Sequence, residues 1–240
     1  MVTQIPRASS QNTPVEATDG PDDLSNHRDR QVIGYLGLAM PFLLVLVVRL
    51  RPNAAADQWS GTSISAYFWT GAVSLFVGIL AALSVYLLTY QGYANESQRW
   101  DRLTAIIAGV SAAVVALFPT TPPLGISALP WWSPWIGKLH AVAAIALFSM
   151  FAVFSLWLFR KTIPGEPLTA DKKQRNAIYL ICGIVIVASM AWALVAGLSD
   201  QSIFWPESLA LVSFAFSWLT KGRAVRSIKS TLGSAKDKIR

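Results

Sequence analysis

Charged residues are scarce in this 240-residue chain, and several long stretches contain none. Asp, Glu, Lys and Arg make up 14% of the sequence, and the uncharged stretches include Tyr67–Tyr90, Leu139–Phe159 and Asn176–Leu198. These stretches exceed what a helix of a soluble protein needs, and they match the roughly 20 residues that cross about 30 Å of hydrocarbon. Because hydrocarbon supplies no water to bond backbone groups, each stretch must form a helix. The composition therefore predicts an integral membrane protein.

Cysteine and histidine are also rare. The single cysteine, Cys182, has no second cysteine with which to form an internal disulfide. A zinc site needs three or four protein ligands, and His140 together with Glu207 supplies too few, since His27 precedes the first apolar run on the other side of the membrane. We expect no bound metal and no redox cofactor.

Six apolar runs, separated by charged or Pro-rich segments, predict an all-α fold: a polytopic transmembrane helical bundle with six spans. The third run has 16 residues, about 24 Å as a helix, and the sixth has Pro206 near its start, so these two spans are short. The predicted spans are Val32–Leu50, Tyr67–Tyr90, Leu103–Phe118, Leu139–Phe159, Asn176–Leu198 and Ile203–Thr220.

The distribution of Lys and Arg predicts the orientation of the spans, because these residues stay on the cytoplasmic side during insertion. With the N-terminus inside, 17 of the 20 Lys and Arg residues fall on the cytoplasmic side, and only Arg49, Arg51 and Lys138 fall outside. An odd number of spans would place the basic C-terminal tail outside and remove this asymmetry. We therefore predict that both termini are cytoplasmic.

The chain is expected to have three parts: a tail at 1–31, a six-helix transmembrane domain at 32–222 and a basic cytoplasmic tail at 223–240. The first tail contains Pro and acidic residues and almost no aliphatic periodicity, which predicts disorder. The second tail is either a short amphipathic surface helix or a solvated segment. The formal net charge of +7 lies beside hydrophobic spans, so membrane topology and anionic headgroups explain it better than nucleic-acid binding does.

Small residues predict how the helices pack, because lipid tails are as apolar as Leu and helices associate through close contact. The third span carries Ala105, Gly109 and Ala113 at four-residue spacing, and we expect it to be the most enclosed helix. Gly78 in the second span and Gly183 in the fifth offer matching small surfaces.

Ionisable residues inside the predicted spans are limited to Arg49, His140 and Glu207, with no Asp or Lys. Ion-coupled transporters usually place a carboxylate or a broken helix near the midplane of the membrane. The midplane of these spans offers only Ser and Cys, so a secondary transporter of charged solutes is disfavoured.

Polar residues gather instead at the outer ends of the spans, under the apolar, Pro-rich connection Thr120–Lys138, which is either an interfacial anchor or a lid. Glu207 follows Pro206 in a first helical turn, where the helix dipole favours negative charge, so a structural role bonded to His140 or a Ser hydroxyl is one explanation. A Ser–His–Glu hydrolase is the alternative, but the chain has no G-x-S-x-G turn. The candidate ligand-binding residues are Ser63, Ser65, Tyr67, Thr120, His140 and Glu207.

A second polar ring is predicted at the inner ends of the spans, with Asp101 and Asn176 as helix caps. Its members are Tyr90, Gly92, Tyr93, Asp101, Arg175, Asn176 and Tyr179.

Several local strings resemble a group of uncharacterised bacterial six-span membrane proteins. They are SISAY (63–67), YQGY (90–93), LFPT (117–120) with His140 at the start of the next span, RNAIYLICG (175–183), and FWPESLAL with FAFSWLTKG (204–222). The Phe-Pro followed by a His-led helix is also similar to the domain-of-unknown-function and DRAM-like six-span proteins. At Val73–Ser74 the chain departs from the Arg–Asp pair expected of such relatives. The resemblance covers about Ser63–Gly222, and it implies a fold and a topology, not a reaction.

These patterns together predict a non-enzymatic, multi-pass protein of the bacterial inner membrane. An outer-leaflet pocket is expected to bind a lipid or small amphiphile, or to dock a partner. The alternatives are a membrane-embedded lipid hydrolase or transferase that uses His140 and Glu207 as acid/base groups, and a permease for neutral solutes. Membrane lipids are the expected partners, a protein partner or a homo-oligomer is a further alternative, and no nucleic acid is expected.

Overall fold

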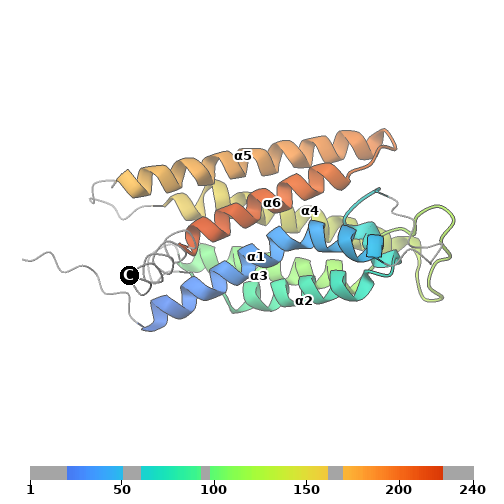
Figure 1. The fold of residues 1–240 in the computed structure, drawn as a ribbon, viewed down its shortest axis with the longest axis horizontal. Coiled ribbons are helices and arrows are strands. Elements are labelled where there is room, and N and C mark those ends of the chain that lie inside the picture. The colour runs from blue at the N-terminus through green and yellow to red at the C-terminus, as the bar shows by residue number, and fades with distance from the viewer. Residues whose placement is uncertain (1–20, 51–60, 93–97, 162–169, 224–240) are drawn as a thin grey trace, which may run out of the picture.

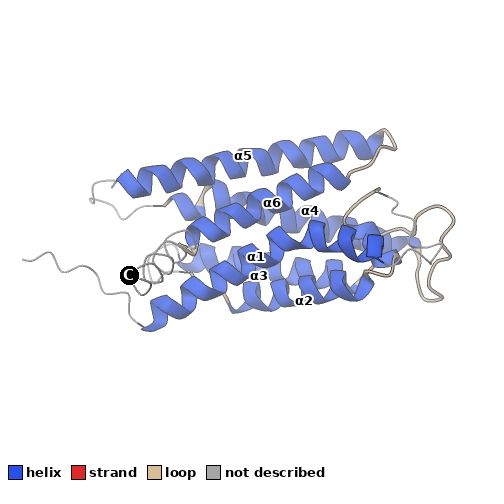
Figure 2. Ribbon diagram, viewed as in Figure 1, coloured by secondary structure: helices blue, strands red, loops and turns tan. Residues whose placement is uncertain are grey.

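The computed structural model describes residues 21–50, 61–92, 98–161 and 170–223. Over these ranges the chain forms six α-helices and two short 3-10 helices, and no strand (Figure 2). The predicted all-α class is confirmed. In chain order the elements are α1 (Pro21–Leu50), η2 (Ser65–Trp69), α2 (Val73–Thr89), α3 (Gln98–Leu117), α4 (Pro134–Leu156), η3 (Leu158–Arg160), α5 (Ala170–Leu198) and α6 (Phe204–Lys221).

The six α-helices form a closed ring, in which each helix packs against the next along the chain and α6 returns to pack against α1 (Figure 1). Consecutive helices run in opposite directions, so the start of α1 and the end of α6 lie at the same end of the bundle. There the side-chain amide of Gln31 donates a 2.8 Å hydrogen bond to the carbonyl of Gly222. We call this the inner end, and the opposite end, where α5 leads into α6, the outer end.

Four helices begin earlier than the apolar runs predict. In α4, which begins at Pro134, the charged residue before the predicted start is Lys138. The other three are α1, α3 and α5, which begin at Pro21, Gln98 and Ala170. Their first turns carry charged residues, which a search for uncharged runs omits although a spanning helix continues into the headgroup layer. The segment 1–31, predicted to be a disordered tail, is therefore helical from residue 21 onward. Residues 1–20 of that tail, and 224–240 of the basic tail, lie outside the described residues.

The second predicted span begins later than expected, because Tyr67 lies in η2 and not in α2. The Ser63 hydroxyl oxygen accepts a 2.9 Å bond from the Ala66 amide, and the Thr70 hydroxyl donates a 2.8 Å bond to the Tyr67 carbonyl. Ser and Thr side chains compete for backbone groups in this way and favour tight turns over continuous helix. Thr70 itself has an extended backbone, which separates η2 from α2.

Four helical segments are long and apolar enough to cross a membrane: His27–Leu50, Arg99–Leu117, Pro134–Arg160 and Ala170–Leu198. α2 is an apolar helix of 17 residues, and α6, with 18 residues, is not among the four. Large apolar side chains cover the outside of the ring, including Phe42, Val142 and Leu194, each at least 64% exposed. A surface of this kind suits contact with lipid tails and not with water.

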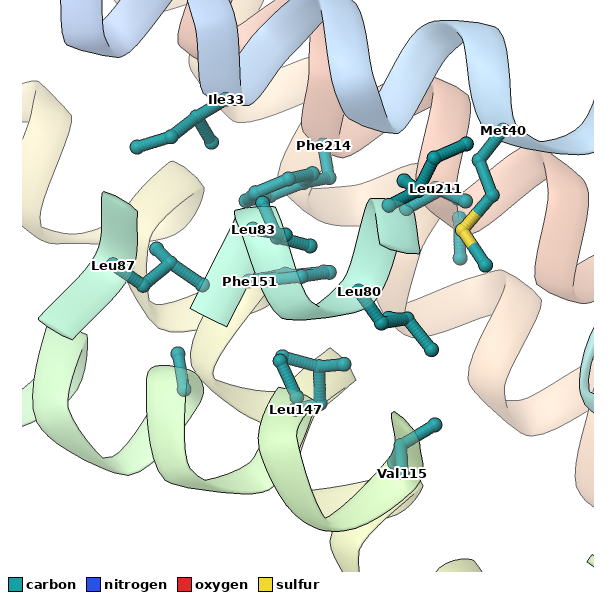
Figure 3. Packing of buried hydrophobic residues seen from close by; sticks show 14 of the residues in the cluster. Ile33, Met40, Leu80, Leu83, Leu87, Val115, Leu147, Phe151, Leu211 and Phe214 are labelled. Carbon is teal, nitrogen blue, oxygen red and sulfur yellow. The ribbon is translucent and has the colours of Figure 1, made fainter. Parts of the chain in front are cut away.

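Apolar side chains fill the inside of the ring. Figure 3 shows Met40 of α1, Leu83 of α2, Leu147 of α4 and Phe214 of α6 directed toward one another. The rings of Phe151 and Phe214 stack with their centroids 3.5 Å apart. A solute path along the axis would have to displace these side chains, which disfavours the permease alternative.

The third span, for which the sequence suggested the greatest enclosure, has fewer neighbouring helices than α4 or α6. α3 packs mainly against α2 and α4, whereas α6 contacts α1, α5 and α4. The small residues of α3 are nonetheless buried as expected, with Ala105, Ala108 and Ala112 fully covered.

Three glycines each pack closely against a leucine of a neighbouring helix. These contacts lie at alternate helix–helix interfaces around the ring. A Cβ atom added at Gly34 would lie 2.6 Å from Leu219, one at Gly109 would lie 2.7 Å from Leu88, and one at Gly183 would lie 2.4 Å from Leu156. These contacts join α1 to α6, α2 to α3 and α4 to α5. At the α2–α3 interface the Ser84 hydroxyl adds a 2.7 Å bond to the Gly109 carbonyl.

Gly109→Ala is expected to destabilise the bundle by about 1–3 kcal/mol, because the added methyl group overpacks the contact with Leu88. Gly78→Ala is the matched control, since nothing lies within 4 Å of a Cβ at that position of α2. It should raise the unfolding temperature slightly, because Ala favours helix over Gly by about 1 kcal/mol. Thermal unfolding of both variants in a mild detergent, followed by tryptophan fluorescence, measures the difference. Equal midpoints for the two variants would contradict the close-contact assignment.

Candidate functional site

The loop before η2 is bound to the start of α6 at the outer end. The Glu207 side-chain oxygen Oε2 accepts a 2.6 Å bond from the backbone amide of Ile64, and the Ile203 amide donates a 2.7 Å bond to the carbonyl of Thr62. The Ser202 hydroxyl bonds the carbonyl of Gly61. Glu207 lies in the first turn of α6, where negative charge is favoured by the helix dipole. Its carboxylate therefore fastens the loop between α1 and α2 to α6.

Side-chain donors from three other segments converge on the backbone that follows α3. His140 Nδ1 lies 2.6 Å from the carbonyl of Phe118, the Trp132 indole bonds the Pro119 carbonyl at 3.4 Å, and the Trp69 indole bonds the Thr120 carbonyl at 3.1 Å. Carbonyls at a helix C-terminus lack partners within the helix. These bonds satisfy such carbonyls and tie η2 and α4 to the end of α3.

His140 is 2% exposed, and only one of its two ring nitrogens has a hydrogen-bond partner among the described residues. A carbonyl only accepts hydrogen bonds, so Nδ1 carries the proton that points at Phe118, and in the neutral ring Nε2 is then an acceptor. Nε2 is buried and has no hydrogen-bond partner among the described residues. A buried polar atom without a partner is costly, and it is rare in native structures.

The other predicted site residues divide into two groups. Ser63, Ser65 and Tyr67 are buried beside the start of α6, where the Tyr67 ring lies 6.0 Å from the ring of Phe204. Thr120 belongs with His140, since both contribute to the cluster at the end of α3. The indole of Trp69, which is part of η2, connects the two groups.

The structure does not pair Glu207 with His140. Each binds a backbone group of a different segment, and the remaining nitrogen of His140 receives no bond from any described residue. The hydrolase alternative requires a hydroxyl hydrogen-bonded to a base that an acid orients in turn. Over the described residues no hydroxyl bonds His140, and the Ser63 hydroxyl oxygen is bound to the Ala66 amide.

The connection between α3 and α4 directs apolar side chains outward. Leu124 is fully exposed, and Trp131 and, in the first turn of α4, Trp135 are each more than half exposed. Exposed tryptophans at the end of a bundle are typical of anchors in the membrane interface. The anchor explanation therefore fits the connection better than the lid explanation.

The inner end contains buried charge, on Asp101 of the predicted inner ring and on one residue of the predicted tail. Arg30, assigned to the disordered tail, is 1% exposed, and Asp101 is 6% exposed. The buried face of α1, with Ile33, Met40 and Leu44, recurs at three- and four-residue steps, and extending that period backward reaches Arg30. Asp101 lies one turn inside α3, and Asn176 lies within α5, so neither caps its helix; Tyr93 lies outside the described residues.

Comparison with protein-family models, curated proteins and solved structures gives no match to this chain. The fold itself defines its class. A closed ring of antiparallel helices, four of them long and apolar enough to span a membrane, with large apolar side chains on its outer surface, is a multi-pass helical membrane protein.

Glu207→Ala is expected to destabilise the protein by about 1–3 kcal/mol and to speed amide exchange at Ile64, because the buried amide loses its acceptor. Glu207→Gln keeps an acceptor oxygen and should lose less stability. Asp200→Asn, which removes an exposed acid from the same end of the bundle, serves as the control. Hydrogen–deuterium exchange of the 61–69 segment measures the effect. Unchanged exchange in Glu207→Ala would show that the carboxylate does not hold this loop.

Proposed function

We propose that this chain is a six-span protein of the bacterial inner membrane, with both termini in the cytoplasm, and that its outer end binds a lipid or small amphiphile without catalysis. Two features support the topology. The start of α1 and the end of α6 meet at the inner end, and every described Lys and Arg except Arg49 and Lys138 lies at that end. This is the charge asymmetry expected of a cytoplasmic face.

The unpartnered Nε2 of His140 is the observation that supports a ligand. An acceptor nitrogen in an apolar setting calls for a donor, so the ligand is expected to carry a hydroxyl or ammonium group. Exposed apolar side chains of the α3–α4 connection, such as Leu124 and Trp131, lie at the same end and suit an acyl or other apolar tail. Binding without catalysis fits the site, because Glu207 accepts a bond from the Ile64 amide and, within the described ranges, is not hydrogen-bonded to His140.

His140→Phe is expected to abolish binding of this ligand while leaving the bundle folded. Native mass spectrometry of the protein purified from membranes, followed by lipid extraction, should find a bound amphiphile on the wild type and none on His140→Phe. Trp132→Phe is the matched control, because it removes a neighbouring bond to the end of α3 and leaves Nε2 untouched. Identical bound molecules on the wild type and on His140→Phe would refute the site.

The topology is tested by cysteine labelling of intact cells in a Cys182→Ser background. Gln201→Cys, in the connection between α5 and α6, should react with a membrane-impermeant maleimide. Ser230→Cys, in the basic tail, should react only after the cells are permeabilised. The reverse pattern would invert the proposed orientation.

A further inference from the structure

Four cations from three helices gather at the inner end of the ring. Lys221 is in the last turn of α6, Arg30 is buried in α1, and Lys172 and Arg175 lie in the first two turns of α5. The charges that act on the Lys221 ammonium are three repelling cations and one attracting acid: Arg30, Lys172, Arg175 and Asp101. Among these described groups the cations around Lys221 outnumber the acids.

Aromatic rings form a layer under these cations. Trp218 is fully buried, and its ring centroid lies 5.1 Å from that of Tyr90 and 5.2 Å from that of Phe159. Arg30 lies over the Tyr90 ring at 5.7 Å, and Lys221 lies over the Phe159 ring at 5.1 Å. Cation–π contacts of this kind stabilise a cation.

The position of two of the cations on α5 adds to the imbalance. Lys172 and Arg175 lie near the N-terminus of a helix of 29 residues, where the helix dipole favours anions and disfavours cations. Lys172 bonds the carbonyl of Phe159 at 3.1 Å, which keeps it directed toward the layer. An anion placed here would interact favourably with the dipole and with the cations together.

We propose that this cationic cluster binds the phosphate group of an anionic phospholipid from the inner leaflet. The cluster lies at the depth of the lipid headgroups, which favours a lipid over a soluble phosphate. Trp100 and Trp157 are about half exposed at the same end, with ring centroids 5.7 Å apart, and tryptophans at this position mark the headgroup layer. Basic pockets between helices at a cytoplasmic face are suited to anionic headgroups. This site lies at the opposite end of the bundle from His140, and it does not depend on the ligand proposed there.

The test uses the full-length protein in a mild detergent, with phosphatidylglycerol and phosphatidylcholine as probes in separate titrations followed by native mass spectrometry. The wild type should bind phosphatidylglycerol in preference to phosphatidylcholine. Lys221→Gln and Arg175→Gln should each weaken the binding of phosphatidylglycerol about fivefold, since each removes one cation near the headgroup. Lys173→Gln removes an exposed cation from the same turns of α5 and should leave binding unchanged.

Three outcomes would overturn the proposal. Equal binding of the two lipids would remove the need for an anion, and an equal loss in Lys173→Gln would show only diffuse attraction to a basic surface. Displacement of phosphatidylglycerol by millimolar inorganic phosphate would assign the site to a soluble phosphate. Arg175 is half-buried on the surface of α5, so its variant should fold even if Lys221→Gln does not, and unfolding temperatures without added lipid check this.

Discussion

Close backbone approach at three glycines is the constraint on which the ring depends. Helices in lipid gain little by hiding apolar surface from one another, so they associate where side chains are small enough for neighbouring helices to touch. Gly34, Gly109 and Gly183 each admit a leucine from the adjacent helix. The three contacts alternate around the ring, and the interfaces between them are filled by the apolar interior (Figure 3). The ring is thus three glycine-matched helix pairs packed around a common core.

The helices were predictable from the sequence because long uncharged, apolar runs mark them. Uncharged runs located all six helices, but they misplaced helix ends wherever charged or hydroxyl side chains decide the boundary, as at Pro21 and at Thr70. The packing role of Gly109 and Gly183 was also predictable from spacing. Gly78 was not distinguishable from them, because its contacts depend on how α2 is rotated in the ring, and Gly78 faces open space.

The outer polar cluster was predictable as a set of residues but not as a set of bonds. The order of spans and connections decides which residues lie at the outer end. That order is enough to group Ser63, Thr120 and Glu207. Their partners are mainly backbone amides and carbonyls, which every residue carries and which leave no mark in the sequence. Glu207 was suggested to bond His140 or a Ser hydroxyl, and it instead accepts a bond from the backbone amide of Ile64. At the inner end, Arg30 was wrongly assigned to the disordered tail, because it is a charged residue that precedes the first apolar run.

Closure of the ring through α1 and α6 affects the order in which the protein can be assembled. α1 leaves the ribosome before the other five described helices, yet its main packing partner, α6, leaves after them, and the bond from Gln31 to Gly222 joins residues 191 positions apart. α6 must therefore be translated before Gly34 can receive Leu219. Until then α1 packs mainly against α2, so a ribosome that stalls within α6 leaves the ring open between α1 and α5.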